Sequence, residues 1–122
     1  MKHAMTYPQR IFAALRMLGL WSNNWPPHGG RLMVGLGGFQ RFDSLAVDNA
    51  GNVCVATLVN GSVSVVAPMG GLIRQIAMPD MFCTNICFGG PDMRTAWLTL
   101  SGTGQLVAMT WPDPGLHLAY EA

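Results

Sequence analysis

Two polar side chains with the chemistry of ligands stand near the starts of short apolar segments. Asp43 opens the stretch "FDSLAVDNAGNVCVAT", and Asn85 opens "NICF". A carboxylate is a ligand for divalent cations such as Ca²⁺, Zn²⁺ or Mg²⁺, so Asp43 is a candidate metal ligand. It has a second interpretation, as an acid at a strand start that accepts backbone N–H bonds in the preceding turn. Asn85 either contacts a ligand in a channel or bonds its own backbone.

Other chemistry-bearing residues show no catalytic spacing. His3, His28 and His117 lie far apart and share no metal-ligand pattern, which indicates surface or loop histidines. Ser101 lacks the glycine two positions earlier that a nucleophile elbow requires, so it is predicted to be a hairpin turn residue. The glycine-rich stretch 35–40, "GLGGFQ", matches neither phosphate-loop pattern.

Composition favours short buried strands in one domain. The chain has 122 residues and a mass of 13.1 kDa; 50% of its residues are hydrophobic, 11% are charged and 15 are glycine. The formal net charge is +1 without a basic run, which argues against a nucleic-acid partner. Cys54, Cys83 and Cys87 are odd in number and form no C-x-x-C pair. We therefore expect reduced, buried thiols in a cytoplasmic protein.

Residues 1–30 are predicted to form an N-terminal arm separate from a domain at 31–122. The arm carries a short helix that begins near Pro8 and ends before the hinge Ser22–Gly30, which is rich in Asn, Pro and Gly. Arg16 interrupts its apolar stretch, so neither a signal peptide nor a membrane span is expected. Trp21 and Trp25 are natural interface anchors.

Beyond the hinge, short runs rich in Val, Ile, Leu and Thr alternate with turn signals. This pattern predicts a meander of antiparallel strands, with a type I′ turn at Asn60 and Gly61. Trp97 and Trp111 are expected in the core. The predicted strands are Ser44–Asp48, Val53–Val59, Ser62–Ala67, Leu72–Met78, Thr84–Phe88, Thr95–Leu100 and Gln105–Trp111.

The strand order repeats along the chain. At an offset of about 41 residues Thr84 falls on Asp43, Ile86 on Leu45 and Phe88 on Val47. Four strands in ~40 to 50 residues are the signature of a β-propeller blade. The expected fold is therefore mainly β: about two four-stranded antiparallel blades of a partial β-propeller with a short helical arm. The second unit lacks an obvious fourth strand, and "RLMVGL" (residues 31–36) either caps a blade or replaces that strand.

From about Gly38 to Ala122 the chain resembles the gluconolactonase, regucalcin and luciferin-regenerating-enzyme family of six-bladed propellers. The motifs are "FDSLAVDNAGNVCVAT", "MPDMFCTNICFGGPDMRTAWLTLSGTGQL" and "WPDPGLHLAYEA". The resemblance implies metal-dependent hydrolysis of a sugar lactone or ester, with a glutamate, an asparagine and an aspartate as ligands. Asp43 matches that aspartate, with Ser44 in place of the usual glycine. The other two ligands do not carry over, and Glu121 matches neither motif.

Two functional hypotheses follow. The first is a truncated propeller module, non-catalytic by itself, that self-associates as a binding or scaffold protein. The second is a metal-dependent lactone or ester hydrolase whose site is rebuilt around Asp43 in an oligomer. Two blades cannot close a ring, and exposed sheet edges invite association, so a homo-oligomer is expected in both cases.

Overall fold

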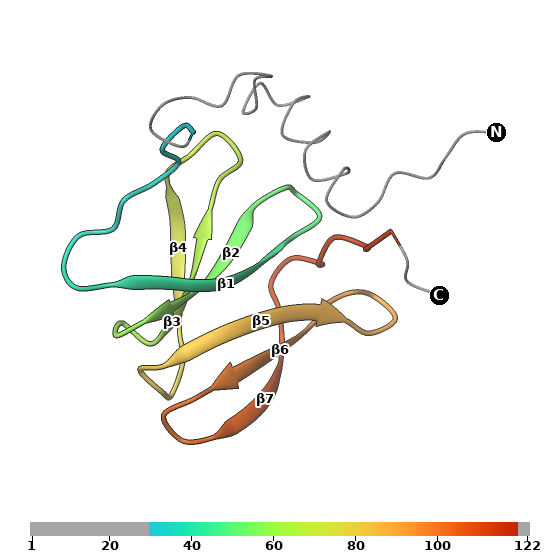
Figure 1. Ribbon diagram of the computed structural model, residues 1–122. Coiled ribbons are helices and arrows are strands. Elements are labelled where there is room, and N and C mark those ends of the chain that lie inside the picture. Colours follow the sequence, from blue (N-terminus) through green and yellow to red (C-terminus); the bar gives the residue numbers. More distant parts are fainter. Residues whose placement is uncertain (1–29, 120–122) are drawn as a thin grey trace. The chain divides into compact units, whose positions relative to one another are not determined.

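The computed structural model describes residues 30–119 (Figure 1). By its internal contacts the chain divides after Leu32, and every strand belongs to the second unit, Met33–Ala122. The strands form two antiparallel sheets with the orders β1-β2-β3-β4 and β5-β6-β7. Their bounds are β1 Arg41–Val47, β2 Val53–Leu58, β3 Ser62–Val66, β4 Leu72–Ala77, β5 Cys83–Gly89, β6 Thr95–Leu100 and β7 Gln105–Thr110.

A buried acid holds the turn between β1 and β2. The carboxylate of Asp48 accepts hydrogen bonds from the backbone N–H groups of Ala50 and Asn52, each at 2.9 Å. Gly51 has a φ of 84°, a left-handed conformation that glycine adopts without steric cost. The sequence "DNAG" therefore reverses the chain through its own side-chain bonds, and the second strand folds back on the first.

The hairpin between β2 and β3 is present, but the predicted type I′ turn is wrong. A type I′ turn needs positive φ at both central residues. Here the positive φ values belong to Val59, at 72°, and Gly61, at 66°, whereas Asn60 lies between them with an ordinary φ. The side chain of Asn60 instead donates hydrogen bonds to Gln40 and Gln75, at 2.8 and 3.1 Å. A longer turn has replaced the two-residue one.

The predicted repeat is visible in the strand pairing. Leu45 pairs with Val55, and Ile86, 41 residues after Leu45, pairs with Leu98. Both inner strands also shift register near their starts, between Phe42 and Leu45 in β1 and just after Cys83 in β5. Such a bulge bends the strand and re-aims one side chain. The two sheets are therefore copies of one structural unit.

The sheets pack front to back, as propeller blades do. One core cluster joins Cys54 and Ala56 of the first sheet to Ile86 and Leu98 of the second. In the repeat, Leu98 corresponds to Val55, which points to the opposite face of the first sheet from its neighbours Cys54 and Ala56. The two sheets thus use opposite faces for one contact, which is the arrangement that a rotation about a central axis produces.

Two connections tie the blades together at opposite ends. Leu58 bridges Phe82, whose carbonyl also accepts a hydrogen bond from the Ser101 N–H at 2.9 Å. At the other end Asp48 bridges Gly115, and the Gly115 N–H donates to the Met93 carbonyl at 2.7 Å. The segment after β7 therefore reaches both sheets.

The prediction of two antiparallel blades is confirmed, and among the described residues the second sheet has three strands, as the lack of an obvious fourth strand in the sequence indicated. Two other predictions are corrected. Residues 31–36 form no strand; the Met33 carbonyl instead accepts a hydrogen bond from the Gly71 N–H at 3.1 Å. Trp97 lies half-buried on the outward face of β6, whereas Trp111 is fully buried.

The predicted N-terminal helix lies outside the described residues. Within residues 30–119 no helix has the length and apolar character needed to cross a bilayer.

Candidate functional site

The two candidate ligands lie on the inner strands of the two blades. β1 and β5 run side by side in the same direction (Figure 1) and are in contact. Asp43 is the third residue of β1 and Asn85 the third residue of β5, so both stand at the same end of the strand pair. The Asp43 charge is one cause of the raised pKa of the Cys83 thiol, after burial and the Asp80 charge. Asp43 therefore lies near the start of β5.

Asp43 is exposed and stands at the register shift of β1. No group among residues 30–119 donates a hydrogen bond to its carboxylate. The backbone bonds that would make it a structural strand-start acid are thus absent from this part of the chain. Because the residue is exposed, its carboxylate can accept hydrogen bonds from a ligand or bind a cation.

Asn85 is also exposed, but its side-chain oxygen is engaged. Its Oδ1 accepts a hydrogen bond from the Ile86 N–H at 2.8 Å. This is the local backbone bond that the sequence offered as one of two alternatives. The amide nitrogen of Asn85 is a hydrogen-bond donor, and calcium and magnesium take oxygen ligands, so this nitrogen cannot replace the engaged oxygen in such a site.

A cluster of hydroxyl groups lies beside Asn85, and no ligand spacing in the sequence points to it. The hydroxyl of Thr84 lies 2.8 Å from that of Thr99 and 3.1 Å from that of Ser101. The repeat places Thr84 at the position of Asp43, so the second blade has a neutral hydroxyl where the first has a carboxylate. That correspondence was the signal available in the sequence. Ser101 lies in the turn after β6, as predicted.

The described residues do not by themselves fit a metal ion. No group of three or more His, Cys, Asp or Glu side chains comes together within residues 30–119. The inner-strand end offers the Asp43 carboxylate and an Asn85 oxygen that already accepts a backbone bond. Calcium takes about 6 to 8 oxygen ligands, and a catalytic zinc generally keeps three protein ligands. A cation at Asp43 would need ligands from elsewhere.

Asp80 is the acid that holds backbone N–H groups, although the sequence did not single it out. Its carboxylate accepts from the Phe82 N–H at 2.7 Å, from the Thr103 N–H at 2.7 Å and from the Thr103 hydroxyl at 2.8 Å. It joins the entry to β5 with the turn between β6 and β7. The Phe82 bond is the main cause of its lowered pKa, and burial opposes it. Asp80 is therefore structural.

Replacing Asp80 with asparagine is expected to lower the melting temperature at pH 7. The melting temperature of the variant should also fall less steeply than that of the wild type as the pH is lowered. The pKa of Asp80 lies below its ordinary value of 3.8 in the folded protein, so the folded state binds this proton less readily than the unfolded state. Its stabilisation is thus complete above pH ~4 and is lost as the pH falls further through the folded pKa. Thermal unfolding from pH 7 to 2.5 measures both effects. Asp92→Asn, on an exposed acid, is the control, and equal acid profiles for the two variants would contradict this role for Asp80.

The three cysteines are free thiols, and two of them are buried. Burial, as the largest cause, raises the pKa of Cys54 to about 12, and it also raises that of Cys83. Both are therefore protonated at neutral pH and are poor nucleophiles and metal ligands. The prediction of buried thiols is wrong for Cys87, which is exposed because it points to the outward face of β5.

Within residues 30–119, His117 joins no group of side chains that could hold a metal ion. His117 is exposed in the segment after β7, and His3 and His28 lie outside the described residues. In the stretch 35–40 the Gln40 side chain donates to the Gly37 carbonyl at 2.7 Å, a bond internal to the loop.

Comparisons with known proteins agree with this architecture. The model of the SMP-30/gluconolactonase/LRE-like region matches residues 22–102. It begins before Gly38, so the family region includes part of the predicted arm, in which the sequence showed no family pattern. A 6-deoxy-6-sulfogluconolactonase from Pseudomonas putida is 37% identical over 81 residues. That alignment covers 65% of this chain and 28% of the relative, so the chain spans less than a third of that protein's length. The repeated blades and the matched region together show that the chain belongs to the SMP-30/gluconolactonase/LRE-like family.

Proposed function

We propose that this chain is a gluconolactonase-like propeller module that is non-catalytic by itself and self-associates as a binding or scaffold protein. The observation that carries the proposal is the donor set on the inner strands. Asp43 is a carboxylate without bonds among the described residues, and the Asn85 oxygen already accepts from Ile86. Metal-assisted hydrolysis needs more protein ligands than these two residues supply.

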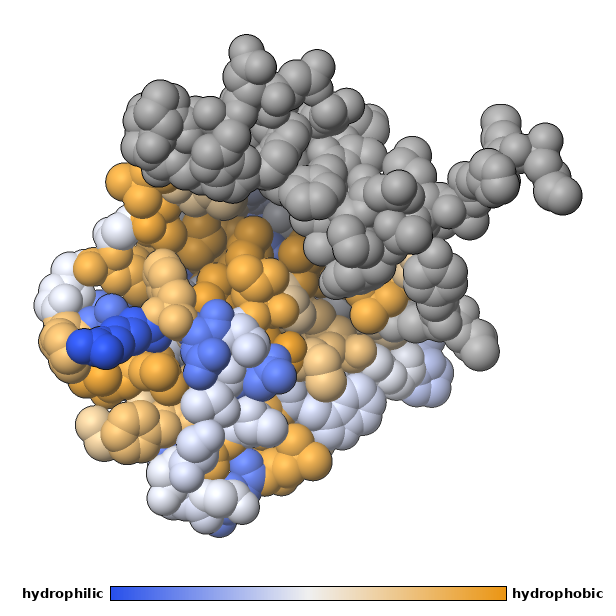
Figure 2. All heavy atoms as spheres, in the orientation of Figure 1, coloured by the Kyte–Doolittle hydropathy of each residue, from blue (hydrophilic) through white to orange (hydrophobic). Residues whose placement is uncertain are grey.

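Apolar surface supports self-association. In a complete propeller each blade face is covered by a neighbouring blade, and β4 and β7 are the outer edges of the two sheets here. Hydrophobic residues reach the surface on the face drawn in Figure 2. Exposed large apolar side chains on the strands, each more than two fifths exposed, are Phe42, Leu45, Leu72, Ile73 and Leu106. Covering them by a second copy removes that surface from water.

We also propose a cytoplasmic location, because the cysteines form no disulfide bonds. Cys54, Cys83 and Cys87 are unpaired, and the reducing cytoplasm maintains free thiols.

A second candidate is a metal-dependent lactone or ester hydrolase with a site rebuilt around Asp43 in an oligomer. The exposed and unbonded carboxylate favours it, because a structural acid in this position would be held by backbone N–H groups as Asp48 and Asp80 are. The relative from Pseudomonas putida is named as a lactonase, which makes a sugar lactone the substrate class to test. Neighbouring copies would have to supply the remaining ligands.

Lactone hydrolysis by the wild type and by Asp43→Ala separates the two candidates. We expect the wild-type chain to hydrolyse sugar lactones, including one from a 6-sulfonated sugar, no faster than buffer, with or without Ca²⁺, Zn²⁺ or Mg²⁺. Asp43→Ala should then be equally inert. Release of acid from the lactone measures the rate.

Metal-stimulated hydrolysis that Asp43→Ala abolishes would overturn the non-catalytic proposal in favour of the hydrolase. Asp92→Ala is the matched control, because Asp92 is exposed and lies in the turn between β5 and β6, away from the start of the inner strands. Loss of activity in both variants would point to a general effect of charge and would argue against a site at Asp43.

A further inference from the structure

The outward face of the second blade carries no charged side chain and exposes a large leucine. Cys87 pairs with Trp97, which pairs with Ala108, and Thr99 pairs with Leu106, so these five side chains share one face of β5, β6 and β7. Leu106 is 70% exposed. We call this surface the outer face. It presents a protruding leucine beside a half-buried indole.

The first blade shows what covers such a surface. Counterparts in the repeat are identified by their partners: Ala46 pairs with Cys54, which pairs with Val65, and Ala56 pairs with Val63. Val63 thus corresponds to Leu106, and it is 0% exposed. Its face packs in one cluster with the inward face of the second blade. The same surface is therefore buried in one blade and open in the other.

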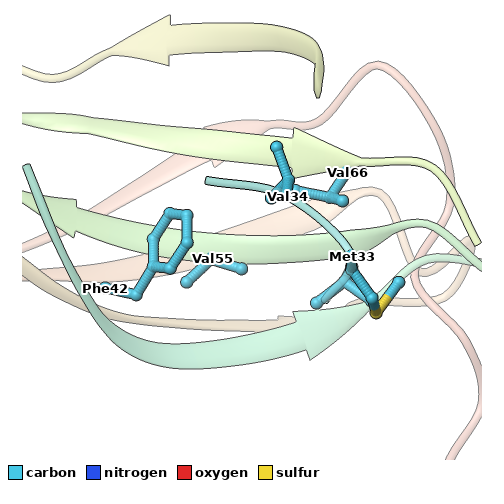
Figure 3. A pocket seen from close by; sticks show the side chains of 6 residues that line it. Met33, Val34, Phe42, Val55 and Val66 are labelled. Carbon is cyan, nitrogen blue, oxygen red and sulfur yellow. The ribbon is translucent and has the colours of Figure 1, made fainter. Parts of the chain in front are cut away.

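A hollow lies on the opposite side of the first blade. It has a volume of about 150 Å³ and is lined by apolar side chains of β1, β2, β3 and the segment before β1. Two of its residues, Val53 and Val55, correspond to Ala96 and Leu98, which pack on the first blade within the chain. Figure 3 shows the side chains that line it, which belong to Met33, Val34, Phe42, Val53, Val55 and Val66.

We infer that a second copy of this chain docks its outer face on this hollow, with Leu106 of one copy inserted between Val34 and Val55 of the next. The inference rests on the proposed self-association and names its surfaces. One chain carries both halves of a contact that it already makes once internally, between its two blades. Neither surface carries a charged side chain, so apolar burial meets no cost of desolvating charge. The contact joins two different faces, so copies add head to tail.

Two single-face variants test this arrangement. Leu106→Asp disables the outer face, and Val34→Asp disables the hollow; each leaves the other surface intact. Both positions avoid the buried core, since Leu106 is exposed and Val34 is partly exposed. Leu118→Asp, at a leucine 52% exposed in the segment after β7, is the control. Circular dichroism verifies the fold, and Leu106→Ser serves as a second outer-face variant if Leu106→Asp does not fold.

Light scattering after size exclusion should find the wild type and Leu118→Asp above the monomer mass of 13.1 kDa. Each single-face variant should associate about 100-fold or more weakly, because a buried unpaired charge is costly. An equimolar mixture of Leu106→Asp and Val34→Asp should form a dimer and stop there, since one intact outer face meets one intact hollow. This rescue is specific to a contact between unlike faces.

Two results would overturn the docking surfaces while self-association stands: single-face variants that associate like the wild type, or an equimolar mixture that stays monomeric. A wild type that is monomeric at all concentrations would overturn the proposed self-association and the docking with it. The measured wild-type mass therefore distinguishes failure of the function from failure of the surfaces.

Discussion

Replacing Trp111 with alanine is expected to lower the free energy of unfolding by about 3 to 5 kcal/mol, the range for removing a buried tryptophan. Trp111 is 0% exposed and is the largest fully buried side chain among residues 30–119. Its ring lies 5.7 Å from that of Phe88, and it belongs to the core cluster that contains residues of both sheets. It therefore packs in the core that the two sheets share, and its removal leaves a cavity whose creation costs stability.

Chemical denaturation followed by tryptophan fluorescence or circular dichroism measures this loss. Trp97→Ala is the matched control, since Trp97 is half-buried on the outer face with its ring over Gly89. We expect the control to cost about 1 kcal/mol, the typical effect of a single substitution. Equal losses for the two variants would mean that Trp111 does not join the blades.

Adding one methyl group at Gly115 is expected to destabilise the protein by about 1 to 3 kcal/mol, the usual cost of overpacking a core. A Cβ at Gly115 would overlap with the Cβ and Cγ atoms of Phe88, which are near the backbone and cannot swing away. Gly115 also bridges Asp48 and donates to the Met93 carbonyl. Gly115→Ala therefore either displaces Phe88 from the core or breaks the tie between the blades.

Thermal unfolding of Gly115→Ala against Gly37→Ala checks this prediction. A Cβ at Gly37 meets nothing within 4 Å, and its φ is not left-handed, so that variant should unfold like the wild type. An unchanged Gly115→Ala would show that the segment after β7 shifts freely. In that case the bridge to Asp48 would not hold the blades together.

An ion pair adds to this connection between the blades. The segment after β7 carries Asp113, whose carboxylate lies 2.6 Å from the Arg74 guanidinium on β4, the outer edge strand of the first blade. Both side chains are more than a third exposed, so this ion pair adds little stability and mainly sets position. Together with the bridge between Asp48 and Gly115, it connects the segment after β7 to the first blade.

The strands and their repeat followed from local patterns in the sequence. Apolar runs separated by glycine turns marked all seven strands, with ends displaced by a few residues; β1, for example, begins at Arg41 and not at Ser44. The offset of 41 residues between Leu45 and Ile86 is confirmed by their pairing partners. Such features are predictable because alternation and turn chemistry act between neighbours along the chain.

The site was less predictable. Sequence pattern named Asp43 and Asn85 and placed them at strand starts, but it did not distinguish an acid that holds a turn from one that faces solvent. Asp80 reaches Thr103, 23 residues away, and this contact exists because the blades bring two turns together. No spacing in the chain encodes it.

The sequence by itself determined the membership in a propeller family, the two-blade repeat and the identity of the candidate ligand Asp43. Only the tertiary structure decided that this carboxylate is unbonded among the described residues, that Cys87 and Trp97 face outward and that Trp111 joins the blades. The reason is physical: alternation assigns a side chain to one of two sheet faces, but which face is buried depends on which surface another blade covers.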